Sequence, residues 1–180
     1  MREPESSDAG LEHGRERSRE RYGIRLDKQY FNFGCAHFLI FADGTREELH
    51  GHNYQATLEL DAALDDGHLV ADFIVVKPLF KQACDELDHR TLFPLRNPHL
   101  QIRTEGASVF GTFGDDQYQV PVRDVKLLDI ANTSSELLAR WLCHRFLERL
   151  RVALPDLPLQ RVLVTVQESP GQSAVYERCF

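Results

Sequence analysis

The chain has 180 residues, 42% hydrophobic and 27% charged, a composition typical of one globular domain with a real core. Its formal net charge of −7 argues against a general affinity for nucleic acid or anionic membranes, because both bind to basic surfaces. No apolar run reaches membrane-spanning length, and the charged N-terminus has no apolar segment of the kind found in secretory leaders. These properties predict a cytoplasmic protein whose partner is a small molecule.

Residues 1–22 are polar and of mixed charge, without the apolar periodicity of a helix or a strand. Glutamates separate the arginines there, so the segment is not a basic patch for nucleic acid. It holds too little apolar surface to offset the entropy of ordering. We therefore expect a disordered tail over residues 1–22 and a single domain over residues 23–180.

Two segments near the N-terminal side of this domain predict neighbouring strands. Residues 30–41 are rich in aromatic and β-branched side chains, and residues 54–64 alternate apolar with polar ones. The polar loop between them carries a turn signal at Asp43-Gly44. The segments therefore predict a strand, a loop and a second strand.

Three histidines lie on these strands or at their edges. His50 and His52 are separated by one glycine, so on an extended strand both imidazoles leave the same face. His37, on the preceding strand, would bring a third imidazole. Three neutral nitrogens suit Zn²⁺, and no Cys or carboxylate stands at ligand spacing to close the site. The sequence predicts zinc bound by these histidines, with an open position for water or substrate.

The middle of the chain predicts a helix and then an insertion. Apolar residues over 73–87 recur at spacings of three and four, and Pro78 restricts the start of the helix to about residues 74–77. The helix should end near residues 87–89. Residues 96–131 are the least regular part and contain a hairpin pattern whose turn is Gly114-Asp115-Asp116.

The last third predicts a second helix and a closing hairpin. Thr133 and Glu136 have the spacing of a capping box, and apolar residues at helical spacing follow up to Pro155. Two alternating segments flank Pro170-Gly171 and predict paired strands. The order is β-β-α-insert-α-β-β, which is an α+β fold.

The four cysteines, Cys35, Cys84, Cys143 and Cys179, are scattered and form no C-x-x-C pair, so we expect no disulfides. Cys35 shares a strand face with His37 and could approach the metal. The more favoured interpretation is a small core thiol.

Six short motifs occur in a fixed order along the domain: Ala36-His37, His50-Gly51-His52-Asn53-Tyr54, the segment from Gly67 to Phe73 with Lys77, Leu87-Asp88-His89, the cap from Asn132 to Glu136, and Glu168 with Ala174-Val175-Tyr176. Together they resemble the 6-pyruvoyltetrahydropterin synthase / 6-carboxytetrahydropterin synthase family. The resemblance runs from about residue 30 to 176 and is broken by the insert.

The resemblance implies the tunnelling fold, with an antiparallel four-stranded sheet and two helices in each subunit. Sheets of three subunits join in a barrel, two trimers stack as a homohexamer, and the sites lie between subunits. The implied activity is that of a zinc-dependent lyase acting on the side chain of 7,8-dihydroneopterin triphosphate or a related pterin.

The resemblance also implies roles for individual residues. Glu168 matches the family's pterin anchor, since a carboxylate accepts two hydrogen bonds from a guanidine-like edge. Ser134 and Thr133 replace the family's usual Pro-Thr before the second helix and still offer hydroxyl and backbone donors to a substrate. Asp88 and His89 match a pair in which the acid orients a proton-transferring imidazole. Without the family resemblance, the favoured interpretation of His89 is a histidine at a helix C-terminus, where this residue type is common.

The chain departs from the family just before the histidine pair. Where a catalytic Cys is usual, four residues before His50, this chain has Arg46. The next residue, Glu47, gives Glu-x-x-His-Gly-His, which resembles a variant subgroup that releases 6-hydroxymethyl-7,8-dihydropterin. Glu47 is thus a candidate base, with a solvated loop residue as the equally weighted alternative.

Other functions stay open at this point. A paralogue that binds zinc and pterin without cleavage would share every feature except turnover. A cupin-type oxygenase also uses His-x-His, but its glutamate is expected where this chain has Ala56 and Thr57. A purely structural zinc module is disfavoured, because such sites use four protein ligands and the three histidines supply only three.

Overall fold

The computed structural model describes residues 20–180, so the predicted tail lies outside the described residues except for positions 20–22. The elements in chain order are β1 (Gly23–Leu26), β2 (Asn32–His37), β3 (His50–Ala62), α1 (Phe73–Asp85), β4 (Arg90–Pro94), β5 (Gln101–Glu105), β6 (Ser108–Phe113), β7 (Asp116–Pro121), a 3-10 turn (Val122–Asp124), β8 (Val125–Leu128), α2 (Ser135–Ala153), β9 (Leu159–Ser169) and β10 (Gln172–Cys179). Neither helix is both long enough and apolar enough to span a membrane.

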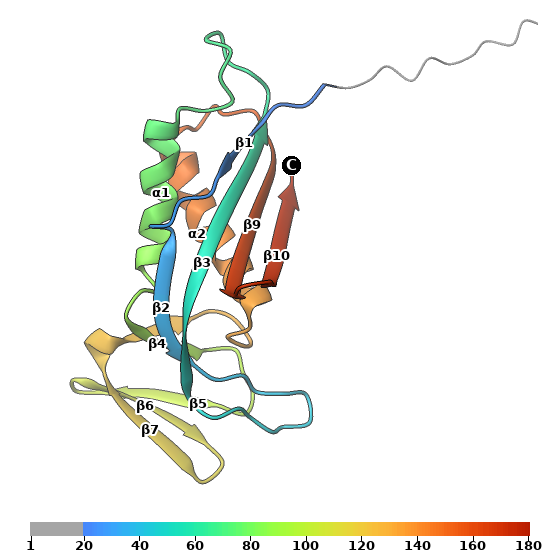
Figure 1. Cartoon of the computed structure of the whole chain (residues 1–180). Helices are drawn as coiled ribbons and strands as arrows, with labels where there is room; N and C mark the ends of the chain where they lie inside the picture. The colour runs from blue at the N-terminus through green and yellow to red at the C-terminus, as the bar shows by residue number, and fades with distance from the viewer. Residues whose placement is uncertain (1–19) are drawn as a thin grey trace, which may run out of the picture.

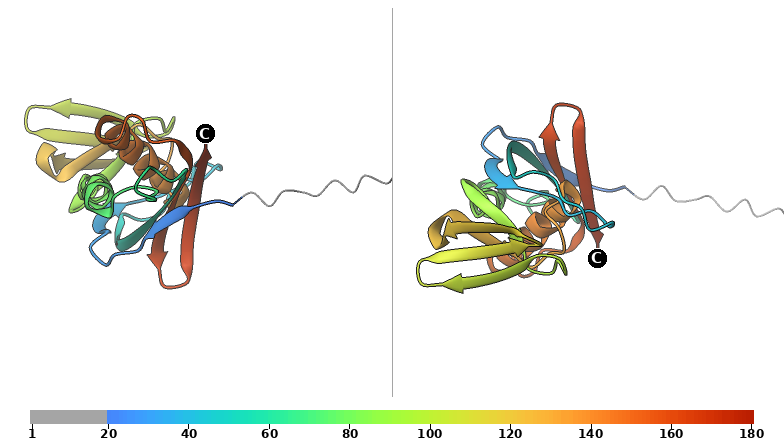
Figure 2. Two further views of the ribbon diagram at one scale, coloured as in Figure 1. Left: turned by 90° about the horizontal axis from the view of Figure 1, so that it is seen from above. Right: turned by 90° about the horizontal axis from the view of Figure 1, so that it is seen from below.

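The main sheet contains the four predicted strands as an antiparallel unit, in the order β10-β9-β3-β2. Three short strands extend it: β1 pairs with the far half of β3, and β4 and β8 follow β2 in parallel. Both helices lie against one face of this sheet, side by side (Figures 1 and 2). The sheet is therefore larger than the sequence predicts, but the α+β layering is confirmed.

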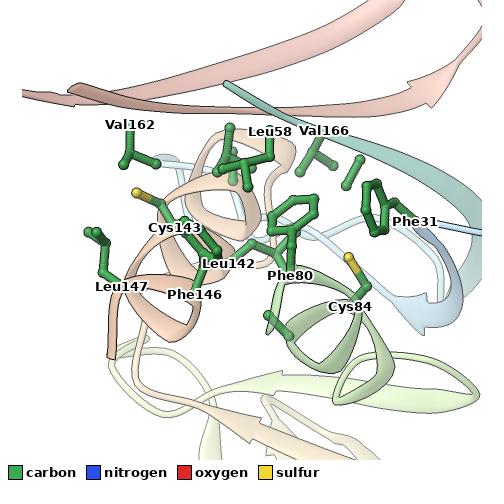
Figure 3. Packing of buried hydrophobic residues seen from close by; sticks show 14 of the residues in the cluster. Phe31, Leu58, Phe80, Cys84, Leu142, Cys143, Phe146, Leu147, Val162 and Val166 are labelled. Carbon is green, nitrogen blue, oxygen red and sulfur yellow. The ribbon is translucent and has the colours of Figure 1, made fainter. Parts of the chain in front are cut away.

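The core lies between the helices and the sheet (Figure 3). Along β3 every second residue from Tyr54 to Ala62 is at most 1% exposed, as expected for a strand with one covered face. Phe80 of α1 packs edge-to-face on Phe31 and on Phe146 of α2, at centroid distances of 5.1 and 5.8 Å. Burying each such ring contributes about 1.5–3 kcal/mol, so this layer fixes the sheet against the helices.

Helix α1 begins one residue earlier than predicted. Asp72 is its N-cap, and the carboxylate accepts a hydrogen bond from the Ile74 amide at 2.7 Å. Pro78 consequently lies inside the helix rather than in its first turn. The predicted C-terminal end is close to the observed one at Asp85.

Helix α2 begins at Ser135, and its N-cap is Ser134. The predicted capping role of Thr133 is therefore wrong. The Thr133 side chain is fully buried, and its hydroxyl donates to the Phe38 carbonyl at 2.9 Å. The Thr133 hydroxyl, which the local pattern assigned to the helix cap, is therefore used in a long-range contact instead.

The predicted hairpin in the insert is confirmed as β6 and β7, with Phe113 opposite Asp116 and Gly114 at a φ of +57° in the turn. The sequence did not reveal β5, which completes a separate three-stranded sheet. This sheet builds a second core from five buried residues: Phe38, Ile40, Phe93, Leu100 and Val109. Since Phe38 follows His37 directly, the insert packs against the segment that leaves β2 (Figure 1).

Candidate functional site

The three predicted metal ligands lie together at one end of β2 and β3. The strand register sets His37 opposite His50, and His52 follows on the same face of β3. One ring nitrogen from each residue lies within 4.8 Å of the other two. The predicted grouping of the histidines is thus confirmed.

The hydrogen bonds of these rings favour the tautomer that a metal needs. Nδ1 of His37 faces the Thr133 carbonyl at 3.1 Å, and Nδ1 of His50 faces the Glu48 carbonyl at 2.7 Å. A carbonyl only accepts, so each Nδ1 carries the proton and each Nε2 carries the lone pair that a metal could bind. Burial, and then the neighbouring imidazoles, lower the pKa of His37, which favours its neutral form.

His52 carries the least satisfied polar atom of the cluster. Its Nε2 is buried and makes no well-formed hydrogen bond among residues 20–180, although Glu168 Oε1 lies 2.8 Å away. A buried ring nitrogen without a partner is costly unless something binds it. The donor set therefore fits a metal ion, and three imidazoles suit zinc.

Tyr54 is a site residue that the sequence reasoning missed as such. It is fully buried, and its hydroxyl lies 2.9 Å from Nε2 of His37. Burial raises the pKa of this phenol, so the hydroxyl stays protonated and can donate to the imidazole. The signal was available, because His50, His52 and Tyr54 alternate along one face of β3.

Glu47 lies beside the histidine cluster. Its Oε2 is 4.0 Å from Nε2 of His50 and accepts a hydrogen bond from the Leu39 amide at 3.2 Å. The side chain is 34% exposed, so it borders the cluster without being sealed from solvent. Of the two interpretations of Glu47, this placement favours the functional one.

Glu168 reaches the cluster from β9. Besides the contact with His52, its Oε2 accepts a hydrogen bond from the Ser135 hydroxyl at 2.9 Å. A cavity of about 250 Å³ opens here, lined by Leu39, Ser134, Ser135, Glu136, Glu168, Gln172, Ser173 and Ala174. Ser134 borders this cavity, whereas Thr133 is buried behind His37. Ser135 was not predicted from the sequence.

Asp88 and His89 form the predicted pair, with Asp88 Oδ2 2.9 Å from Nδ1 of His89. Burial opposes ionisation of Asp88, but hydrogen bonds from the Gly34 amide and from His89 outweigh it and lower its pKa. His89 has a φ of +55° and a side chain that is 87% exposed. The pair therefore presents an oriented, accessible imidazole.

This pair does not join the histidine cluster within one chain. It borders an open cavity of about 500 Å³ that is lined by His52 of the cluster and also by Gly34, Ala36, Gly51 and Asn53. The last four residues alternate with the metal-ligand positions along β2 and β3, so they face the opposite side of the sheet. Within one chain, the Asp88–His89 pair therefore lies outside the group of three converging histidines, and His52 is the member of that group that reaches the same cavity.

Cys35 is not placed to react as a thiolate. It lies opposite His52 on the covered face and is 7% exposed. Burial, with the charge of Asp88, raises the pKa of the thiol to about 12. A neutral, buried thiol is a packing residue, in agreement with the favoured interpretation.

A mostly antiparallel sheet backed by two helices, with three histidines at one end of two adjacent strands, defines a tunnelling-fold subunit. The family model described as 6-pyruvoyl tetrahydropterin synthase matches residues 26–179. The chain belongs to this family.

Relatives agree on the family and differ in their named reactions. A Methanocaldococcus jannaschii protein, provisionally named 6-carboxy-5,6,7,8-tetrahydropterin synthase, is 31% identical over 81% of this chain and 89% of its own length. The crystal structure of Plasmodium vivax 6-pyruvoyl tetrahydropterin synthase superposes with a TM-score of 0.83 at 30% identity, covering 90% of this chain and all of that one. Two further P. vivax structures carry alanine or cysteine in place of a glutamate that their descriptions call a catalytic residue.

Proposed function

We propose that this chain is a cytoplasmic, zinc-dependent lyase or synthase that acts on the side chain of 7,8-dihydroneopterin triphosphate or a related pterin. One observation carries the proposal: two carboxylates from distant parts of the chain flank the three converging imidazoles. Glu47 Oε2 lies 4.0 Å from His50 Nε2, and Glu168 Oε1 lies 2.8 Å from His52 Nε2. Acidic, anchoring and metal-binding groups thus meet in one place.

His37, His50 and His52 are the residues that would hold the metal. Zinc bound there would act as a Lewis acid and lower the pKa of a substrate hydroxyl. The carbonyls of Thr133 and Glu48 fix the orientation of two of the imidazoles, as backbone acceptors do for many metal-bound histidines.

Glu168 is the proposed anchor for the pterin ring. A carboxylate suits the paired N–H donors of the ring, and the cavity beside Glu168 gives the ring a place next to the metal site. Ser134 and Ser135 line the same cavity at the N-terminal end of α2, where backbone amides can donate to ring acceptors. This arrangement would direct the pterin side chain toward the cluster.

Glu47 is the proposed base that accepts a proton when a bond of the side chain breaks. Its distance from His50 supports this role, and so does the P. vivax enzyme, in which a glutamate is described as catalytic. The Glu-x-x-His-Gly-His pattern favours 6-hydroxymethyl-7,8-dihydropterin as the product over a 6-pyruvoyl or 6-carboxy product. The reaction then breaks a carbon–carbon bond of the side chain.

We further propose that residues 23–180 form one domain and that subunits assemble as trimeric barrels stacked in a hexamer. Strands β1 and β10 each have an unpaired edge among the described residues, and such edges invite pairing with another subunit. An intersubunit site would also give His89 a role. The imidazole is exposed on the opposite face of its own sheet, so it would transfer protons at a neighbouring subunit's zinc.

The test is incubation of the zinc-loaded protein with 7,8-dihydroneopterin triphosphate, followed by identification of products by mass spectrometry. A 6-hydroxymethyl product supports the proposal with Glu47 as base. A 6-carboxy or 6-pyruvoyl product supports the lyase and shifts the base to another group. Absence of turnover with this and other pterins would favour a paralogue that binds zinc and pterin without cleavage.

A further inference from the structure

Arg46 occupies the position at which a catalytic Cys is usual, and its side chain is held by the insert. The Arg46 side chain is 16% exposed. Its Nε and Nη2 donate to Oδ2 of Asp116 at 3.1 and 2.5 Å. The rings of Phe38, Phe113 and Tyr118 surround it, with centroids 5.7, 5.9 and 5.7 Å from Cζ. Asp116, Phe113 and Tyr118 all belong to the β6–β7 hairpin.

A further donor of this guanidinium, Nη1, faces the segment that precedes His50, where it also lies 3.7 Å from a carboxylate oxygen of Glu48. Nη1 of Arg46 donates to the carbonyl oxygen of Glu47 at 2.7 Å. Two more bonds hold Glu47 against Leu39: its amide donates to the Leu39 carbonyl at 2.9 Å, and its carboxylate accepts from the Leu39 amide at 3.2 Å. Glu47 is therefore fixed at its amide, its carbonyl and its carboxylate.

We propose that Arg46 is a positioning residue, through which the β6–β7 hairpin holds the Glu47 carboxylate beside the histidine cluster. The role rests on the proposed function, because it concerns the proposed base. The path is continuous: Asp116 orients the guanidinium, the guanidinium fixes the Glu47 peptide, and the peptide sets where the carboxylate stands. The insert thereby gains a function in the reaction.

The chemistry of the side chain explains why arginine suits this position. A planar guanidinium can bind a carboxylate on one edge, donate to a carbonyl from another and lie between aromatic rings. A lysine ammonium is a single point of charge and cannot make all of these contacts with one geometry. Misplacement of a catalytic group by about 1 Å can lower the rate about 100-fold. Loss of the contacts that hold Arg46 should therefore lower kcat.

The experiment compares Arg46→Lys and Asp116→Asn with a control that weakens the core beneath these rings and removes no group that contacts Arg46. Val109→Ala is the control, because Val109 is 2% exposed in the core of the insert and is not among the groups that bind Arg46. Each variant is assayed for kcat, KM, zinc content and Tm. We expect Arg46→Lys to lower kcat about 10- to 100-fold, with KM within about twofold and zinc unchanged. Val109→Ala should lower Tm and leave kcat near that of the wild type.

Two kinetic results would overturn the inference. One is an Arg46→Lys enzyme with wild-type kcat, while Glu47→Gln is inactive. The other is a loss of kcat in Val109→Ala that matches its loss of Tm, since Arg46 would then serve only the stability of the insert. Restoration of kcat by Asp116→Glu, which keeps the carboxylate, would support it.

Hydrogen exchange separates failure of this inference from failure of the proposed function. If the wild type does not turn over, or if Glu47→Gln is fully active, the function proposed for Glu47 is wrong. The exchange rates of the Leu39 and Glu47 amides then test the positioning role by themselves. Faster exchange over residues 38–48 in Arg46→Lys than in Val109→Ala supports it, and equal exchange overturns it.

Discussion

The Nε2 atom of His52 lies 2.8 Å from Oε1 of Glu168, which joins the metal-ligand strand β3 to the end of β9. A carboxylate in this position can receive a ring donor from a ligand while the histidine binds a metal. The contact therefore couples the proposed zinc site to the proposed pterin anchor. Because the two sites use different side chains, mutation can separate zinc binding from pterin binding.

We expect Glu168→Gln to weaken pterin binding about 10- to 100-fold while zinc content stays unchanged. The amide offers one acceptor without charge, and charge-assisted hydrogen bonds are worth about 1.5–3 kcal/mol. Fluorescence titration with a pterin measures affinity, and elemental analysis measures zinc. The control is Glu177→Gln on β10, whose carboxylate pairs with Arg161 outside the cavity. Undiminished affinity in Glu168→Gln would remove the anchor from the proposal.

His50→Ala should abolish the metal, of which the purified wild type should hold about one zinc per chain. Loss of one of three imidazoles leaves two ligands, too few for a tight zinc site. Elemental analysis of the dialysed protein checks this. His89→Ala is the control, because His89 lies outside the cluster and should leave zinc in place. A His50→Ala protein with full metal content would contradict the site.

Glu47→Gln should lower kcat about 100- to 10,000-fold, because general-base catalysis contributes on that order. The amide keeps the shape and cannot accept the proton. Steady-state turnover with the substrate identified by mass spectrometry is the measurement. Glu48→Gln is a matched control one residue away, since the Glu48 side chain is 97% exposed and its ion pair with Arg46, at 3.7 Å, is a surface contact of little energy. Equal activities of the two variants would assign the base elsewhere.

Mixed oligomers should recover activity that their parents lack. If His89 acts at a neighbouring subunit's zinc, then Glu47→Gln and His89→Ala subunits damage different halves of the site. Refolded together, they would form some intact sites, whereas Asp88→Asn mixed with His89→Ala would form none. Turnover of the mixtures measures this. No recovery in the first mixture would argue for sites within one chain.

Glu86 should stabilise the fold in a pH-dependent manner. Its side chain is 18% exposed and bonds to Lys126, Arg145 and Arg149. Burial opposes ionisation, but these cations outweigh it and lower the pKa of Glu86 from its usual 4.5. Glu86→Gln should therefore lower the free energy of unfolding by about 2 kcal/mol near neutral pH.

The pH dependence of this effect follows from the direction of the pKa shift. The stabilisation is fully present above about pH 4.5 and is lost as pH falls through the lower folded pKa, so wild type and Glu86→Gln should converge in acid. Urea unfolding over a pH series measures this. Glu148→Gln, which removes an exposed partner of Arg145, should change little. A constant difference at every pH would show that charge is not the cause.

Local pattern determined a large part of this protein. Strand alternation set His50 and His52 on one face, helical spacing located α1 and α2, and turn residues located two hairpins. The motif order predicted the family, and the family model confirms it. These features depend on residues close in sequence, so their periodicity reveals them.

Only the tertiary structure decided what distant residues do together. It turned the Thr133 hydroxyl toward Phe38 instead of the helix end, extended the sheet through β4 and β8, and left His89 outside the group of three converging histidines. It also brought Asp116 of the insert to Arg46. Such contacts depend on how the chain closes over long loops and packs its core, and no short-range pattern records that outcome.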